Sequence, residues 1–366
     1  MDFEFSTEQE MLRSSVRSFL AEVAPISSVR SGARSDDVWK GLVDLGVLGL
    51  LVPERYGGAG MGMVDAAVVL EELGRAVCPS PFLSSAIGAM PLLADLGDAD
   101  ADADALASLL DELVKGRRTG TVALFEPDRR YEWRVPATTA TTGTAGTWHL
   151  DGTKVHVTDV DVAGGVLLAT ARDPDGRLGV FLARGDAQEQ PTVDLTRHEW
   201  TVTLREGQRI GGGADATGAV ARTLDRLGVA AVVDGVGAAQ RALELAVEYA
   251  KERVQFGKPI GSFQAVQHLC ADMLRTVELG RAAAYYACWA LDEAPPEEAH
   301  RAAVLAQAFA ADAFPQLGGT AIQVFGGIGF TWEHDIHLYY KRLLSQSVAL
   351  GTANDYLAEL AHLAID

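Results

Sequence analysis

The sequence has 366 residues, of which 48% are hydrophobic, and this is enough apolar material for more than one buried core. Its net charge of −19 argues against nucleic-acid binding, which needs a basic face. The opening MDFEFSTEQEM lacks the basic region of a signal peptide, no apolar run is long enough to span a membrane, and the three scattered cysteines are typical of a reducing compartment, so we expect a cytoplasmic protein.

The first third of the chain is predicted to be helical. The segment FSTEQEMLRSSVRSFLAEV places Thr7 three residues before Glu10, which is a capping-box spacing, and continues with apolar residues at helical spacing. Two more helices are expected in residues 36–50 and 63–77, with the turn PERYGGAGM between them. We assign residues 1–119 to an N-terminal helical domain.

The hydrophobic period changes near residue 120. The runs TVALFEP, TWHLDGTKVHVTD, VAGGVLLATAR and RLGVFLARG are short, rich in Val, Thr and Leu, and separated by Gly, Asp and Pro. They predict antiparallel strands, and we assign residues 120–212 to a middle β-domain. The segment RIGGGADATGAVA is expected to be a flexible joint.

Long helices return after the joint and are assigned to a C-terminal four-helix-bundle domain, residues 213–366. One of them contains Pro315, which is expected to end or kink it. The order of helices, strands and helices predicts an α+β fold with a C-terminal bundle.

The segment ERVQFGKPIGSFQAVQH closes one long helix and opens the next. The guanidinium of Arg253 could hold a phosphate or pyrophosphate in a forked geometry, with Phe256 as an aromatic plate and Gln264 as a polar group nearby. A structural interpretation stays open, in which Arg253 caps the helix and Phe256 belongs to the core.

The segment IQVFGGIGF is rich in glycine but is not a dinucleotide fingerprint, because no strand precedes it. Gly326 and Gly327 could end a helix, or they could let the backbone approach a ligand closely, with Gln323 one turn earlier as a hydrogen-bonding group.

These two segments, together with the strand segment HLDGTKVHVTD, resemble the acyl-CoA dehydrogenase family, and the resemblance in length and order extends over nearly the whole chain. The resemblance implies a flavoprotein in which FAD lies across an interface between two subunits. A carboxylate takes the α-proton of an acyl-CoA while the β-hydride passes to the flavin, and an acceptor such as an electron-transfer flavoprotein removes the electrons.

In this family one subunit cradles the flavin ring with its middle domain, and the neighbouring subunit supplies residues for the adenosine and pyrophosphate. By position, this chain keeps the residues that the family uses for the adenosine and pyrophosphate of the neighbouring subunit's FAD, here called the second set. The cofactor-binding residues implied by the resemblance are Arg253, Phe256, Gln264, Gln323, Gly326, Gly327 and Thr352.

The first set, by the same resemblance, is incomplete. The family strand usually reads T-E-P-x-A-G-S-D, and here LFEPDRRYEW keeps Glu126 and Pro127 but has Phe125 in place of the threonine. The next strand usually reads W-I-T-N, and here VHVTD has His156 in place of the tryptophan and keeps Thr158.

The catalytic base of the family is also replaced. The usual glutamate directly precedes Gly-Thr, where this chain has Leu350, and the alternative position in the long helix is Leu227. Asp234 is the nearest carboxylate in a suitable helix. It could be a relocated base or a paired core aspartate, and we favour the second interpretation.

These losses affect one half of the site only. They predict the non-catalytic subunit of a heteromeric acyl-CoA dehydrogenase whose homologous partner chain carries the glutamate. The resemblance is closest to the paired enzymes of actinobacterial steroid side-chain breakdown. Two alternatives stay open: a self-sufficient homotetramer that uses Asp234 as base, and a scaffold that binds no flavin. The sequence leaves the acyl group undetermined.

Overall fold

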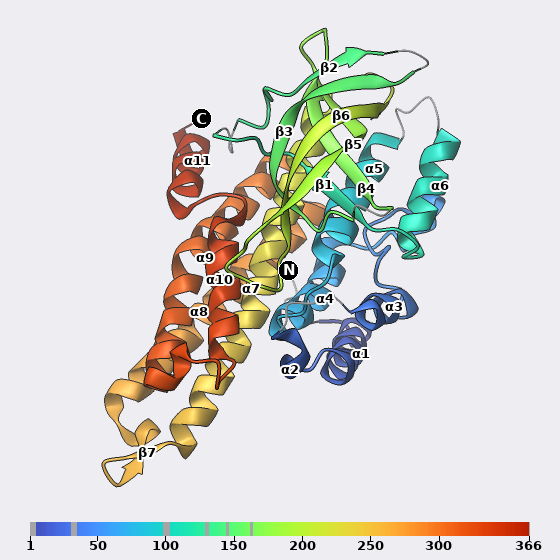
Figure 1. Cartoon of the computed structure of the whole chain (residues 1–366). Helices are drawn as coiled ribbons and strands as arrows, with labels where there is room; N and C mark the ends of the chain where they lie inside the picture. Colours follow the sequence, from blue (N-terminus) through green and yellow to red (C-terminus); the bar gives the residue numbers. More distant parts are fainter. Residues whose placement is uncertain are drawn as a thin grey trace.

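The computed structural model describes residues 5–30, 35–97, 103–128, 132–143, 146–161 and 164–365. Within these ranges a group of helices is followed by a curled sheet and then by a bundle of long helices (Figure 1). This is the predicted α+β order. The boundaries at 119/120 and 212/213 stay a prediction.

In Figure 1 helices α1 to α4 lie below the sheet, and α5 and α6 lie beside it. Their bounds are α1 Thr7–Val23, α2 Ile26–Val29, α3 Asp36–Asp44, η1 Glu54–Tyr56, α4 Met63–Arg75, η2 Leu83–Ala89, α5 Met90–Gly97 and α6 Ala103–Val114. The capping box of α1 lies one residue earlier than predicted, because Ser6 is the N-cap and exchanges hydrogen bonds with Gln9. The π-helical turn η2 and α5 were not predicted.

The six strands of the middle part form a sheet with the order β1-β4-β2-β3-β6-β5, and β5 also pairs with β4, so the sheet closes into a barrel. The strands are β1 Gly120–Ala123, β2 Thr139–Thr142, β3 Trp148–Thr158, β4 Val166–Arg172, β5 Leu178–Gln190 and β6 Glu199–Ile210. Most pairs are antiparallel as predicted, but β4 runs parallel to β1 and β2. Hydrophobic alternation is the same in parallel and antiparallel strands, so the sequence could not predict the direction of β4.

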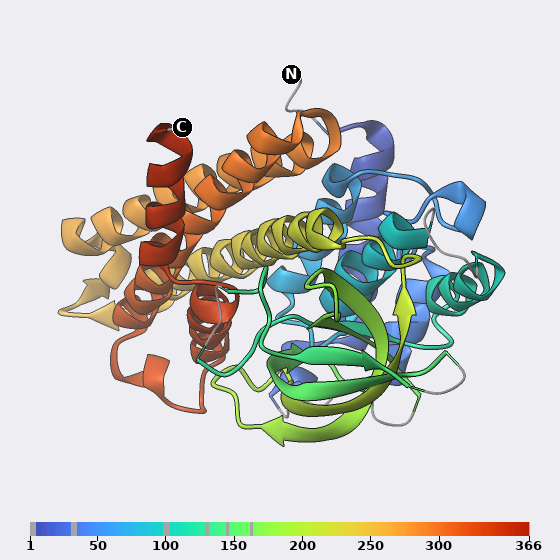
Figure 2. The ribbon, with the colours of Figure 1, turned by 90° about the horizontal axis from the view of Figure 1, so that it is seen from above.

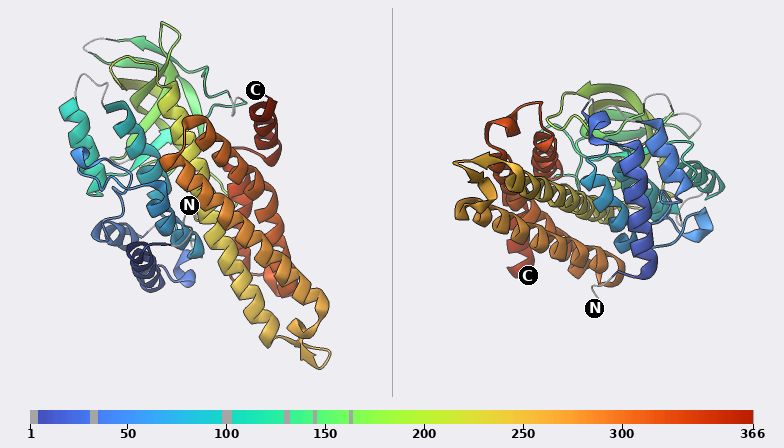
Figure 3. Two further views of the ribbon diagram at one scale, coloured as in Figure 1. Left: turned by 180° about the vertical axis from the view of Figure 1, so that it is seen from behind. Right: turned by 90° about the horizontal axis from the view of Figure 1, so that it is seen from below.

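The C-terminal part is built from the long helices α7, α8 and α9, with α10 and α11 packed against them (Figure 3). The elements are α7 Thr217–Glu252, β7 Val254–Gln255, β8 Lys258–Pro259, η3 Ile260–Ser262, α8 Gln264–Glu293, α9 Pro296–Phe325, η4 Gly326–Phe330, α10 Ile336–Ala349 and α11 Ala353–Ile365. Pro315 lies inside α9, so the prediction that it ends the helix is wrong. Packing against α7, α8 and α10 compensates for the one N–H that proline lacks. No helix within the described ranges is both long and apolar enough to cross a membrane.

Helices α4 and α7 cross with their backbones in contact. A Cβ atom added at Gly74 would lie 1.9 Å from the carbonyl oxygen of Asp234, and one added at Gly237 would lie 1.9 Å from that of Glu71. Any larger residue at either glycine would push the helices apart. This crossing fixes the N-terminal helices on α7, which lies between the barrel and the other long helices in Figure 2.

A buried ionic cluster joins the barrel to the bundle. Arg342 of α10 is fully buried, and its Nε donates to Asp194 Oδ2 at 2.6 Å and its Nη1 to Asp234 Oδ1 at 2.9 Å. Arg197 adds a second guanidinium, 2.8 Å from Asp234 Oδ2. Asp194 and Arg197 lie in the loop between β5 and β6, and Asp234 lies in α7. Burial opposes the ionised form of Asp194, yet the charge of Arg342 holds its pKa below the usual value.

We expect Arg342→Ala to destabilise the protein by about 3–5 kcal/mol, because it leaves two buried carboxylates with too few cations. Urea unfolding of both proteins measures this difference. The matched control is Arg205→Ala, which removes a guanidinium from an exposed ion pair with Asp186 and should cost less than about 1 kcal/mol. Similar losses for the two variants would contradict this role of the cluster.

Candidate functional site

The sequence-predicted site residues lie in two separate places. The first is the free end of the bundle, far from the barrel in Figures 1 and 3. There Arg253 follows the last residue of α7, and the hairpin β7–β8 turns through Phe256 and Gly257, both with positive φ (54° and 78°). This is the geometry of a two-residue type I′ turn. It holds the Phe256 ring 92% exposed at the tip of the hairpin.

The start of α8 and the end of α9 meet the same end of the bundle, because these two helices run in opposite directions. The rings of Tyr249 and Phe325 stack at 4.4 Å and hold the end of α9 against α7. Gly326 has φ 65°, and a Cβ atom at Gly326 or Gly327 would have no neighbour within 4 Å in the described part of the chain. The six residues exposed at this end, here called the tip set, are Arg253, Phe256, Gln264, Gln323, Gly326 and Gly327.

The tip is locally positive although the chain is acidic. Residues 251–264, from the end of α7 to the start of α8, contain three Lys or Arg and one Glu, whereas the whole chain has a net charge of −19. The tip therefore presents a guanidinium, an exposed aromatic ring, two amide side chains and open glycine backbone. This combination suits an anionic ligand with an aromatic group that lies outside the chain.

The second place is a cavity between the barrel and the bundle, here called the cradle cavity. It holds about 850 Å³ of space open to solvent, and its lining includes Leu350, Leu227, Phe125, His156 and Thr158. The structure thus brings together both positions that the family uses for its base and the three cradle positions identified by resemblance. Both base positions present only carbon to this cavity.

Six polar residues that line the cradle cavity were missed by the sequence analysis: Ser84, Asp159, Arg197, Glu199, Ser345 and Gln346. His156 Nδ1 lies 2.8 Å from Glu199 Oε2, and Ser84 Oγ donates to Asp159 Oδ2 at 2.8 Å. Arg197 also lines the cavity. Asp159 directly follows Thr158 and could have been found from the strand motif, but Ser84, Arg197 and Glu199 come from distant segments that only the fold brings together.

Asp234 does not line the cradle cavity. It is 2% exposed and is bound by Arg342, Arg197 and Gln346. A carboxylate tied to two guanidiniums and an amide is poorly placed to take a proton from a ligand. This geometry supports the interpretation of Asp234 as a paired core aspartate.

Glu126, which this chain shares with the family strand, has a structural role here. Its carboxylate accepts hydrogen bonds from the backbone of Ala137 at 2.6 Å and of Thr138 at 2.9 Å, and from Lys154 Nζ at 2.8 Å. Burial opposes ionisation, but the charge of Lys154 and these donors lower the pKa of Glu126 to about 2. Glu126 therefore anchors residues 137–138 beside β3, and its presence does not argue for a cofactor in the cradle cavity.

Thr352 lies at the junction of α10 and α11, away from the tip set. Its N–H donates to Asp355 Oδ2 at 2.9 Å, and the N–H of Asp355 donates back to Thr352 Oγ1 at 3.4 Å. Thr352 is thus the cap of α11. The structure does not bring it together with the other six residues predicted to bind the cofactor.

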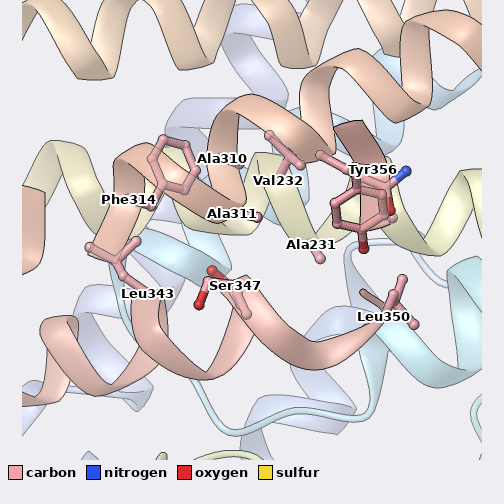
Figure 4. Close-up of a pocket in the computed structure, with 12 residues that line it drawn as sticks. Ala231, Val232, Ala310, Ala311, Phe314, Leu343, Ser347, Leu350 and Tyr356 are labelled. Atoms are coloured by element: carbon pink, nitrogen blue, oxygen red, sulfur yellow. The ribbon is translucent and has the colours of Figure 1, made fainter. Parts of the chain in front are cut away.

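A second, smaller cavity of about 340 Å³ lies behind Leu350, between α7, α9, α10 and α11 (Figure 4). Leu350 and Tyr356 lie at one end of it, and Phe314 and Leu343 lie at the other. Leu350 lines both cavities, so the residue at the usual base position is an apolar partition between them.

A helical N-terminal part, a β-barrel and a long-helix bundle, with a cavity where barrel and bundle meet, define the fold of an acyl-CoA-oxidising flavoprotein. Two family models match, "Acyl-CoA dehydrogenase, N-terminal domain" over residues 6–112 and "Acyl-CoA dehydrogenase, C-terminal domain" over residues 217–361. The chain belongs to the acyl-CoA dehydrogenase family. Members of this family are FAD-dependent oxidoreductases that act on the CH–CH group of acyl-CoA thioesters.

Similar proteins include heteromeric assemblies. The acyl-CoA dehydrogenase IpdE2 of Mycobacterium tuberculosis is 34% identical over 359 residues, which cover 96% of each chain. A variant of the Tcur3481–Tcur3483 steroid ACAD has a TM-score of 0.86 at 30% identity, with 98% of each chain covered. The ChsE4–ChsE5 complex of M. tuberculosis has a TM-score of 0.87 at 25% identity and covers 100% of this chain and 99% of that one.

The two places differ in how well they suit FAD. The tip set has a forked cation for a pyrophosphate and open backbone at Gly326 and Gly327, so it suits the adenosine end. The cradle cavity has Phe125 where the family has a hydroxyl, and it is lined by the carboxylates of Asp159 and Glu199. It does not suit a negatively charged cofactor.

Helix α11, which closes the small cavity, is held by a histidine between two carboxylates. His300 Nδ1 lies 2.8 Å from Asp225 Oδ1, and Nε2 lies 3.0 Å from Glu359 Oε1 of α11. These two hydrogen bonds outweigh the effect of burial and raise the pKa of His300 to about 10.

We expect this link to weaken at alkaline pH. The folded-state pKa of His300 is above that of the unfolded chain, about 6.5. Its contribution to stability is therefore fully present below about pH 6.5 and is lost as the pH rises through about 10. The loss of stability in His300→Gln should shrink over this range in urea titrations. A pH-independent difference for His300→Gln would contradict the assignment.

Proposed function

We propose that this chain is the non-catalytic subunit of a hetero-oligomeric acyl-CoA dehydrogenase. It supplies the tip set to FAD that is held in the cradle of a homologous partner chain, and the partner carries the catalytic glutamate. The reaction is the α,β-dehydrogenation of an acyl-CoA thioester.

The observation that carries this proposal is the distance between the tip set and the cradle cavity. Leu227 and Arg253 lie 26 residues apart on one helix, which at 1.5 Å per residue is about 39 Å. A single dinucleotide is far shorter than this. The tip set and the cradle cavity of one chain therefore cannot hold the same FAD molecule, and the tip set has a use only beside another chain.

The chain's own residues provide binding at the tip and no proton transfer in the cavity. Arg253 would hold the pyrophosphate, Phe256 would cover an aromatic face, and the backbone at Gly326 and Gly327 would allow the adenosine to approach closely. FAD, when bound, supplies the hydride acceptor of the family reaction. Leu350 and Leu227 cannot accept the α-proton, so a carboxylate of the partner must do so.

The substrate class and partner follow from similarity. The Tcur3481–Tcur3483 protein is described as a steroid ACAD and ChsE4–ChsE5 as a complex of two chains. These descriptions support a homologous partner chain and an acyl group attached to a steroid. An acceptor such as an electron-transfer flavoprotein completes the cycle. The alternative of a homotetramer with Asp234 as base has less support, because Asp234 is bound to two arginines.

We expect the isolated chain to be inactive and Leu350→Glu to leave it inactive. Loss of a positioned base alone costs on the order of 10²–10⁴ in rate, and the variant still lacks a suitable cradle. The assay uses acyl-CoA substrates with an artificial electron acceptor. Turnover by the wild-type chain at ordinary family rates, about 1–10³ s⁻¹, would refute the non-catalytic role. Robust turnover by Leu350→Glu would instead show that the chain's own cradle binds flavin.

We expect the complex to contain one FAD for each pair of unlike chains and to lose it with Arg253→Ala. The remaining site combines the partner's cradle with this chain's tip set, so removal of its forked cation should release flavin and activity together. Flavin absorbance against protein concentration measures both. The control Arg275→Ala removes an exposed arginine of α8 outside the tip set and should keep the FAD. Two FAD per pair, or an Arg253→Ala complex that stays yellow, would contradict the proposal.

A further inference from the structure

The polar residues that line the cradle cavity are held in place by specific contacts. A site that had lost its function would not require such contacts. The ladder between β3 and β6 is irregular between Lys154 and Val157, and this bulge contains His156 with φ 53°. Asp159, directly after β3, has φ 57°. Positive φ is uncommon outside glycine, although His and Asp adopt it more often than most residues do.

Neighbouring residues hold His156 and Asp159 in these conformations. Glu199, at the start of β6, holds the His156 ring at 2.8 Å. Asp159 is 6% exposed, accepts a hydrogen bond from Ser84 at 2.8 Å, and donates its backbone N–H to the carbonyl of His198 at 3.1 Å. The two carboxylates are thus fixed where they line the cavity.

The cavity lining has an excess of negative charge. Arg197 is the only arginine or lysine among the described residues that line the cavity. Its guanidinium is already paired with Asp234, 2.8 Å away, so it offers little attraction to an anion. Glu199 and Asp159 face the same space, and an anion that entered would meet like charges in a partly desolvated site.

We infer that Glu199 and Asp159 exclude FAD from this chain's own cradle cavity by charge repulsion, in addition to the donors that the cavity lacks. The flavin ring is uncharged, but its ribityl chain joins it to a pyrophosphate with two negative charges, and a ring that entered the cavity would also remove water from both carboxylates. His156, held by Glu199, stands at the position where the family places a tryptophan beside the flavin. This inference rests on the proposed function. It adds that this chain's own cradle cavity repels the cofactor, so that FAD binds in the partner's cradle instead.

The test is a titration of the full-length isolated chain with FAD, followed by quenching of flavin fluorescence. The wild-type chain should bind weakly. The variant Glu199→Gln with Asp159→Asn, which removes both charges and keeps similar shapes, should bind at least about tenfold more tightly. Phe125→Thr alone, which restores a hydroxyl but leaves both charges, should stay as weak as wild type.

Two further variants identify the site. The control Glu206→Gln with Asp186→Asn removes two exposed carboxylates from β5 and β6 outside the cavity and should not change binding. Adding Arg253→Ala to the charge-neutral variant should abolish the gain, because a second copy must supply the tip set. Thermal melting of each variant checks that it is folded.

The outcomes separate the inference from the proposed function. If the charge-neutral variant is folded and stays as weak as wild type, or if Phe125→Thr alone restores binding, repulsion is not the cause and the inference fails while the proposed function stands. If the wild-type isolated chain binds FAD tightly at one per chain, both fail.

Discussion

The buried guanidinium of Arg342 is the interaction on which the shape of the site depends. It needs carboxylates from two directions, and these come from the loop between β5 and β6 and from α7. The hydrogen bonds of this guanidinium hold the barrel against α7 and α10. The cradle cavity lies between the barrel and these helices. Asp234 is the carboxylate from α7 that binds Arg342. An aspartate that could have served as a base is used to hold the fold together.

Helix α7 separates the two functional ends of the molecule. Its first half lines the cradle cavity through Leu227, and its last turn leads to Arg253 at the exposed tip. A 36-residue helix cannot bend back, so under the proposed function the two ends serve different cofactor molecules. The tip set is exposed in the isolated chain for the same reason. The Phe256 ring has an edge contact with Phe263 but stays 92% exposed, and a Cβ atom at Gly326 or Gly327 would meet no atom within 4 Å in the described part of the chain.

The two ends also differ in electrostatics. The tip gathers positive charge in a chain that is strongly acidic, whereas the cradle cavity combines an apolar floor at Leu350 and Leu227 with carboxylates at Glu199 and Asp159. The first environment attracts a pyrophosphate and the second repels one. Under the proposed function, the leucines at the positions of the family base and the carboxylates of Glu199 and Asp159 in the same cavity act in the same direction. Together they favour a division of labour between unlike chains.

The sequence by itself determined the order of helices, strands and helices, because hydrophobic periodicity encodes it. The tip-set residues and the leucines at the base positions were predicted from the resemblance to the family. The sequence analysis placed the capping box one residue late and expected Pro315 to end a helix, since local propensity ignores packing. Only the tertiary structure decided that Asp234 is bound by Arg342 and that Thr352 caps α11. It also showed that Glu199, Ser84 and Asp159 share a cavity with Leu350. These juxtapositions join residues between 3 and 266 positions apart, and the longer ones depend on how the barrel docks on the bundle, which no local pattern records.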